Sequence, residues 1–143
     1  MWAGGLAAIV VPSSADMPVR CLIVDDNACF REEARRLLER EGIAVVATAA
    51  SSSEALRRLD VVAADIALVD VDLGGESGFD LAAKLGSGSA RRPHVILVSI
   101  RDESEYVELI ATSSAVGFLA KAELSAEAIH RILASADVEG DAG

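Results

Sequence analysis

The sequence predicts an α/β fold in which helices cover both faces of a five-stranded parallel sheet. Five short apolar runs alternate with five helical patterns along the chain. The runs are rich in Val and Ile and are continuous rather than alternating, which is typical of strands covered on both faces. At 143 residues the chain has the length of one domain. These observations predict a three-layer (βα)5 sandwich.

The strands are expected where the apolar runs lie. The runs span residues 20–25, 44–49, 66–70, 94–99 and 116–120. Right-handed crossovers and a single switch point favour the flavodoxin-like strand order 2-1-3-4-5. The first and third strands are then neighbours at the centre of the sheet, so Asp25, Asp26 and Asp70 are expected to lie close together.

The helices are bounded by residues that start or stop a helix. Their expected positions are residues 28–41 with Gly42 as the stop, a helix after the capping box Ser51-Ser52-Ser53-Glu54, residues 78–85, a helix after the N-cap Asp102, and a helix opening at Ser125. Each helix follows one strand, which completes five βα units.

Both ends of the chain are expected to lie outside the folded domain, which we place at residues 19–136. Within residues 1–18 an apolar run from Trp2 to Val11 lacks the positive start of a secretory signal. It also has about half the length of a membrane span. We expect a loosely ordered extension there, with a short docking segment as the alternative, and a frayed acidic tail at residues 137–143.

Composition argues against several functions. The formal net charge of −10 repels a phosphate backbone, so direct binding of nucleic acid is not expected, and neither is a membrane partner. Cys21 and Cys29 form no CxxC pair, which favours two buried thiols in a reducing cytoplasm over a zinc or redox site. His94 and His130 are interpreted as structural or solvated.

Four of the apolar runs end in polar residues: Asp25-Asp26, Asp70, Ser99 and Lys121. The carboxyl ends of parallel strands share one edge of a sheet, so these residues are expected to converge. Clustered carboxylates repel one another, and Mg²⁺ is the ion that best relieves this repulsion, because it binds carboxylates, waters and phosphate oxygens together. The sequence therefore predicts a magnesium site beside a phosphate site.

The residues of this edge suit phosphoryl transfer. Lys121 and Ser99 can stabilise the oxygens of a transferring phosphoryl group. A carboxylate can itself act as the nucleophile and form an acyl phosphate. Asp70 is the best candidate, because it is central and precedes the glycine-rich loop 73–78, whose small residues let the backbone approach a phosphate.

Taken together, these motifs resemble the receiver domain of two-component response regulators over about residues 19–135. The resemblance rests on Asp25-Asp26, Asp70 with Gly78 eight residues later, Ser99, and Phe118-Leu119-Ala120-Lys121. The spacings are 44 residues from Asp26 to Asp70, 29 on to Ser99 and 22 on to Lys121. The stretch from Asp26 to Glu32 is most similar to receivers that precede helix-turn-helix output domains.

The resemblance implies that Asp70 accepts a phosphoryl group from a phosphohistidine on a sensor histidine kinase. It also implies that Asp25, Asp26, Asp70 and the backbone carbonyl of Asp72 hold Mg²⁺. The chain is then a phosphoacceptor signalling domain rather than an enzyme that acts on a free substrate.

The same resemblance implies a switch. Lys121 would pair with the phosphate, Ser99 would move toward it, and Phe118 would swing into the space that Ser99 leaves. The fourth helix, fifth strand and fifth helix would then repack and bind a downstream protein partner. Phosphorylation-dependent dimerisation at that face is a further hypothesis.

Several positions depart from the usual pattern. Gly74 stands where the family usually has Pro, which predicts a more flexible loop, and the bulk of Ile100 is expected to narrow access to Asp70. Phe118 replaces a frequent Tyr and lacks its hydroxyl. Asp72 and Arg101 flank the route of attacking water and are expected to tune the lifetime of the phosphorylated state.

Two other functions stay open at this point. A degenerate receiver could act only as a protein docking module. Asp70-Val71-Asp72 also resembles the opening motif of haloacid-dehalogenase-like phosphatases. Those enzymes carry that motif after the first strand and need an acidic pair downstream, whereas here the pair precedes it.

Overall fold

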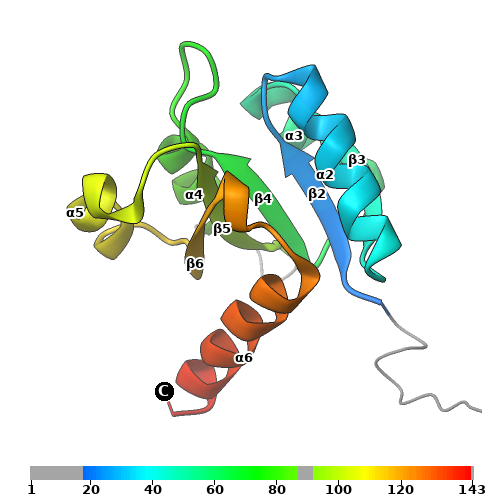
Figure 1. Cartoon of the computed structure of the whole chain (residues 1–143). Coiled ribbons are helices and arrows are strands. Elements are labelled where there is room, and N and C mark those ends of the chain that lie inside the picture. The colour runs from blue at the N-terminus through cyan, green and yellow to red at the C-terminus, as the bar shows by residue number, and fades with distance from the viewer. Residues whose placement is uncertain (1–17, 87–91, 143) are drawn as a thin grey trace, which may run out of the picture.

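A parallel sheet of five strands forms the middle layer of the residues that the computed structural model describes, 18–86 and 92–142 (Figure 1). The strands are β2 (Arg20–Val24), β3 (Ala44–Ala49), β4 (Ile66–Asp70), β5 (His94–Ser99) and β6 (Gly117–Ala120). Their order, β3-β2-β4-β5-β6, confirms the predicted order 2-1-3-4-5. All neighbouring pairs are parallel, so every strand ends at the same edge.

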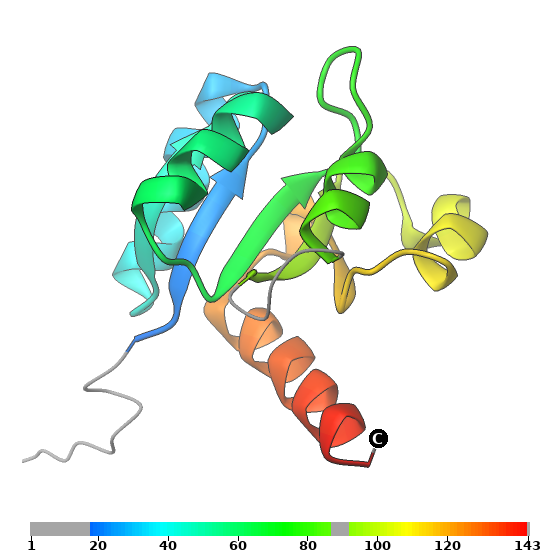
Figure 2. The ribbon, with the colours of Figure 1, turned by 180° about the vertical axis from the view of Figure 1, so that it is seen from behind.

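Helices cover both faces of this sheet (Figures 1 and 2). One face is covered by α2 (Ala28–Arg40) and α6 (Ala126–Ala142), and the other by α3 (Ser52–Val61) and α4 (Gly78–Gly86). The remaining helical segments are the 3₁₀ helix η2 (Glu103–Tyr106), α5 (Val107–Ala111) and the 3₁₀ helix η3 (Lys121–Glu123). Across the described segments, we find no helix with both the length and the apolarity that crossing a membrane requires.

Side chains on alternate strand positions enter two separate cores, as the period of a strand requires. Ile23, Leu68 and Ile96 pack with α2 and α6, in what we call the α2/α6 core. Leu22, Val69 and Leu97 pack with α3 and α4, in the α3/α4 core. The strands therefore read as continuously apolar because both of their faces are buried.

Local capping explains where the helices begin. Asn27 caps α2 by accepting a hydrogen bond from the Phe30 N–H at 3.1 Å. Ser51 caps α3 through the N–H of Glu54 at 3.2 Å. The Glu54 carboxylate reaches back one residue further than a capping box does, to the N–H of Ala50 at 2.7 Å.

Two helix predictions need correction. The helix expected after Asp102 is divided into η2 and the short α5, because Tyr106 leaves helical geometry (φ −127°, ψ 17°) and packs its ring between Phe79 and Phe118. The acidic segment expected to fray at 137–143 is helical as far as Ala142, as a continuation of α6. Residues 1–17, expected to form a loose extension, lie outside the described residues.

The two cysteines lie in different environments. Cys21 is fully buried on β2, and burial raises the pKa of its thiol to about 12. Cys29 is exposed on α2, so the expectation of two buried thiols is wrong for Cys29. The core face of α2 is supplied instead by Ala34 and Leu38.

An aromatic disulfide reagent at pH 8 is therefore expected to modify Cys29 alone in the folded protein and both thiols in urea. Absorbance of the released thiolate counts the reacted groups. The variant Cys29→Ser is the control and should show no fast reaction. Rapid modification of Cys21 in the folded Cys29→Ser protein would contradict the buried environment of β2.

Candidate functional site

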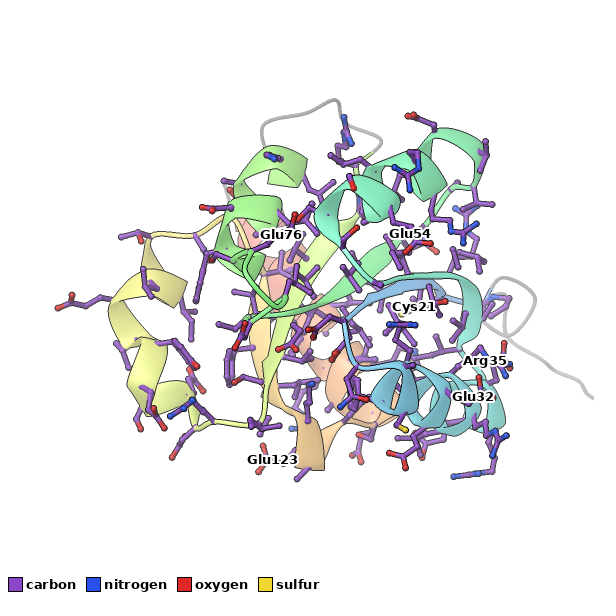
Figure 3. All side chains as sticks on the ribbon, turned by 90° about the horizontal axis from the view of Figure 1, so that it is seen from above. Cys21, Glu32, Arg35, Glu54, Glu76 and Glu123 are labelled. Carbon is purple, nitrogen blue, oxygen red and sulfur yellow. The ribbon has the colours of Figure 1, made fainter. Side chains whose placement is uncertain are left out.

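The side chains of Asp25, Asp70 and Lys121 share one face of the sheet at its carboxyl edge. Val24 pairs with Val69, so Asp25 and Asp70 lie level on adjacent strands. By strand alternation Asp70 continues the face of Leu68, and Lys121 follows the face of Leu119. The three residues, far apart in sequence, meet where the α2/α6 core reaches the edge that Figure 3 views from above.

Three carboxylates form a cluster at this edge. Asp25, Asp26 and Asp70 each offer an oxygen within 4.8 Å of the others. Asp25 is fully buried and Asp70 is only 7% exposed, whereas Asp26 is exposed. The Asn27 N–H donates to Asp25 Oδ1 at 2.8 Å, but Asp25 Oδ2 receives no well-directed hydrogen bond. Three clustered carboxylates, two of them buried, fit a hard divalent cation, so these residues could hold a metal ion.

Lys121 is the cation of the cluster. Its Nζ lies 2.6 Å from Asp25 Oδ2, an ionic contact, and 3.3 Å from Asp70 Oδ2. The ammonium also sits 4.3 Å from the centroid of the Phe30 ring. Burial lowers the pKa of Lys121, but the two carboxylates more than reverse this and leave it raised. The ammonium is therefore charged throughout the ordinary pH range.

Asp70 has an unusual proton affinity. Burial, followed by the negative charge of Asp25, raises its pKa to about 6. The Asp72 N–H, 3.2 Å from Asp70 Oδ1, and Lys121 act in the opposite direction and favour the carboxylate. A bound cation would add to these favourable contacts and keep Asp70 ionised.

Glycines let the loop after β4 come close to the acids. Gly74 has a positive φ of +64°, and a Cβ at this position would lie 2.4 Å from Asp26 Oδ2. A Cβ at Gly78 would lie 2.1 Å from the backbone oxygen of Asp70. Proline, whose φ is fixed near −65°, could not adopt the conformation of Gly74. This loop backbone therefore follows a different path from one built on Pro.

The hydroxyl and the arginine predicted for the site lie on the loop after β5. Ser99 is 4% exposed, and its Oγ accepts a hydrogen bond from the Arg101 N–H at 3.0 Å. The Arg101 guanidinium turns toward η2 and pairs with Glu105 at 3.2 Å. Ile100 is 83% exposed and borders the cavity at its rim.

A cavity of about 290 Å³ brings these groups together. Asp25, Asp26, Asp70, Asp72, Ser99, Arg101 and Lys121 all line it. Phe118 does not. It borders an adjoining cavity, and its ring centroid lies 6.1 Å from that of Tyr106.

The sequence did not indicate three residues that contribute here. Tyr106 lines the acid cavity, and its ring centroid lies 6.0 Å from that of Phe79. Asn27 also lines the cavity, and Arg31 Nη1 donates to the backbone oxygen of Asp25 at 2.6 Å. Only Asn27 carried a signal, as a residue type that favours helix N-caps.

The family model of the response regulator receiver domain matches residues 21–134. The chain belongs to this receiver family. The receiver is 30% identical to the signal receiver domain of the putative response regulator NarL from Mycobacterium tuberculosis, with a TM-score of 0.71 over 84% of this chain and 97% of that one. A LuxR-family regulator from Aurantimonas sp. SI85-9A1 is 31% identical, with a TM-score of 0.73 over 82% and 86%.

Curated relatives are longer than this receiver. It is 27% identical over 115 residues to the response regulator UvrY of Escherichia coli, covering 80% of this chain and 52% of the relative. The protein-glutamate methylesterase/protein-glutamine glutaminase 5 of Myxococcus xanthus is 29% identical over 129 residues, with 83% and 37% covered. The chain thus spans about half or less of their lengths. The match to the family model confirms the predicted resemblance to receiver domains. The similarity of this chain to NarL- and LuxR-type regulators agrees with the predicted resemblance to receivers that precede helix-turn-helix domains.

Proposed function

We propose that this receiver is a phosphoacceptor in a two-component phosphorelay, with Asp70 as the accepting residue. A carboxylate oxygen of Asp70 attacks the phosphorus of a phosphohistidine on a sensor kinase. The new P–O bond forms as the P–N bond breaks, and the imidazole keeps the electron pair and takes up a proton. What supports this most is the position of the Asp70 carboxylate, within 4.8 Å of two further acids and 3.3 Å from Lys121.

The residues around Asp70 have the chemistry that this transfer needs. Asp25, Asp26, Asp70 and the backbone carbonyl of Asp72 would hold Mg²⁺, which supplies positive charge to the transferring oxygens when bound. Lys121 would turn from the carboxylates to the phosphoryl group. The low exposure of Asp25 and Asp70 strengthens both interactions, because little water screens their charges.

The residues that would respond to phosphorylation lie on the face of the sheet opposite to Asp25, Asp70 and Lys121. Ser99 follows Leu97 in strand alternation, and Phe118 packs against the α3/α4 core. A shift of Ser99 toward the phosphoryl group would free space for Phe118, which contacts Tyr106 at the start of α5. We propose that the face formed by α5, β6 and α6 then binds a cytoplasmic protein partner or a second copy of the chain, and not nucleic acid.

Asp72 and Arg101 belong to the same proposal as residues that tune the lifetime of the phosphorylated state. Both line the cavity beside Asp70. Arg101 is paired with Glu105 on η2, so its reach toward the cavity depends on that contact.

Acetyl phosphate with MgCl₂ tests the proposal. The intact protein is expected to gain one phosphoryl group by mass, and Asp70→Asn is expected to gain none. No gain with acetyl phosphate or a phosphorylated kinase would favour a docking module instead. Rapid turnover of a general phosphatase substrate would favour an enzyme.

A further inference from the structure

The loop between β4 and α4 is a small hairpin that projects beyond the carboxyl edge of the sheet (Figure 1). The Leu73 N–H donates to the Glu76 backbone oxygen at 3.0 Å, and Asp72 pairs with Ser77 in an isolated antiparallel bridge. The Gly74 N–H donates to Asp72 Oδ1 at 3.1 Å. The hairpin therefore holds its own shape, but none of these contacts fixes its angle to the sheet.

Two side chains tie this hairpin to the rest of the fold. Leu73, at its base, is buried in the α3/α4 core, and Glu76 joins the hairpin to α3. Glu76 Oε1 accepts a hydrogen bond from the N–H of Ser52 at 3.0 Å, across 24 residues of sequence. Figure 3 shows Glu76 beside the start of α3, where Glu54 also lies. The contact joins the acceptor loop to the helix that covers the same face of the sheet as α4.

The start of α3 is suited to hold a carboxylate. The first turn of a helix leaves backbone N–H groups without partners, and its dipole favours negative charge. Ser51 Oγ takes the N–H of Glu54, and the Ser52 N–H, in a residue that is 7% exposed, is left for Glu76. The hairpin between β4 and α4 therefore supplies the hydrogen-bond partner of the Ser52 N–H.

The tether bears on the metal site through Gly74. Gly74 lies so close to Asp26 that a Cβ there would be 2.4 Å from its carboxylate, and Asp72 stands two residues before it. The two glycines at 74 and 75, both with positive φ, do not restrict the backbone themselves. Leu73 and the Asp72 N–H, which donates to Asp70 Oδ1 at 3.2 Å, hold the base of the hairpin. Without the Glu76 contact, the tip of the hairpin would be freer to carry Gly74 away from Asp26.

We propose that Glu76 is a positioning residue that holds the acceptor loop over the acid cluster by anchoring it to α3. The inference rests on the proposed function, because it assigns Glu76 a part in Mg²⁺ binding and phosphoryl uptake. Glu76 itself touches neither the metal ligands nor the phosphoryl group. It acts through the placement of Gly74 beside Asp26.

Four variants separate this role from general folding. Glu76→Ala removes the acceptor, and Glu76→Gln keeps an oxygen that can accept the same hydrogen bond. Ser52→Pro removes the donor at the first position of α3, where proline is tolerated, and the extended Ser51 before it (φ −153°, ψ 168°) suits a following proline. Glu127→Ala is the matched control, since it removes an exposed carboxylate from the first turn of α6.

The measurement is a MgCl₂ titration of the labelled full chain by amide NMR, followed by the rate of phosphoryl uptake from acetyl phosphate. Glu76→Ala and Ser52→Pro are expected to bind Mg²⁺ about tenfold more weakly, which is the lower end of the loss that follows when the support of a metal ligand is removed. Glu76→Gln and Glu127→Ala should match the unaltered protein. The amide resonance of Ser52 should shift in Glu76→Ala but not in Glu76→Gln. The double variant Glu76→Ala with Ser52→Pro should bind Mg²⁺ no more weakly than either single variant.

Unaltered Mg²⁺ affinity in both Glu76→Ala and Ser52→Pro would overturn the inference while the proposed function stands. Equal weakening in Glu76→Ala and Glu76→Gln would also overturn it, because charge rather than the tether would then matter. If the unaltered protein neither binds Mg²⁺ nor takes up a phosphoryl group, the proposed function itself fails. These results are distinguishable because the unaltered protein is measured in the same series.

Discussion

Replacing Lys121 with Met is expected to lower the free energy of unfolding by about 3 kcal/mol at pH 7 in the absence of metal. The Lys121 ammonium lies 2.6 Å from the buried Asp25 carboxylate and 3.3 Å from Asp70. Its removal leaves both negative charges uncompensated where little water can reach them. Methionine keeps an apolar stem against Phe30, so the loss reports the charge and not the packing.

Urea unfolding in EDTA, followed by circular dichroism, gives this free energy. The double variant Asp25→Asn with Lys121→Met is the control and should recover most of the loss, because it removes the buried carboxylate as well as its partner. MgCl₂ should also restore part of it by replacing the lost positive charge. A single variant as stable as the unaltered protein would contradict the compensating role of Lys121.

Asp70→Asn is expected to be more stable than the unaltered protein by about 2 kcal/mol at pH 7.5 in EDTA and nearly equal to it at pH 4. The pKa of Asp70 is raised from 3.8 to about 6 in the folded protein. Between these values the folded state binds more protons than the unfolded state, so the contribution of Asp70 to stability falls as the pH rises. Above about pH 6 this destabilisation by Asp70 is complete.

The difference between the two proteins, measured by urea unfolding across this pH range, isolates Asp70. Glu32 and Asp65, whose pKa values are lowered by hydrogen bonds from arginines, change stability in the opposite sense at low pH. They do so equally in both proteins and cancel in the difference. A difference that does not change with pH would show that Asp70 has an ordinary pKa.

The sequence was sufficient to predict which residues meet at the edge of the sheet. Four of the five strands are apolar runs that lead into a polar residue, and the order of βα units determines which ends are adjacent. Asp25, Asp70 and Lys121 therefore converge as expected, 45 and 51 residues apart along the chain. The roles of these residues in phosphoryl transfer stay predictions.

Other features depend on contacts that no local pattern encodes. The helix after Asp102 is interrupted because Tyr106 turns toward Phe79 and Phe118, a tertiary contact that overrides helix propensity. The hydrogen bond from Ser52 to Glu76 spans 24 residues, and nothing in the local sequence of either residue indicates the other. Glycine at position 74 predicted a more flexible loop. The hydrogen bonds within the hairpin restrict the backbone motion that this glycine would otherwise permit.

The separation of the two cores by the sheet has a consequence for how this protein can change. The acids and Lys121 meet at the end of the α2/α6 core, while Ser99 and Phe118 face the α3/α4 core. The two sets of residues therefore lie on opposite faces of the sheet and meet at its carboxyl edge, where Ser99 and Tyr106 line the same cavity as Asp70. A substitution that changes how Phe118 packs in the α3/α4 core is therefore expected to leave the α2/α6 core beneath Asp25 and Asp70 unchanged, whereas one at Tyr106 would also alter the cavity.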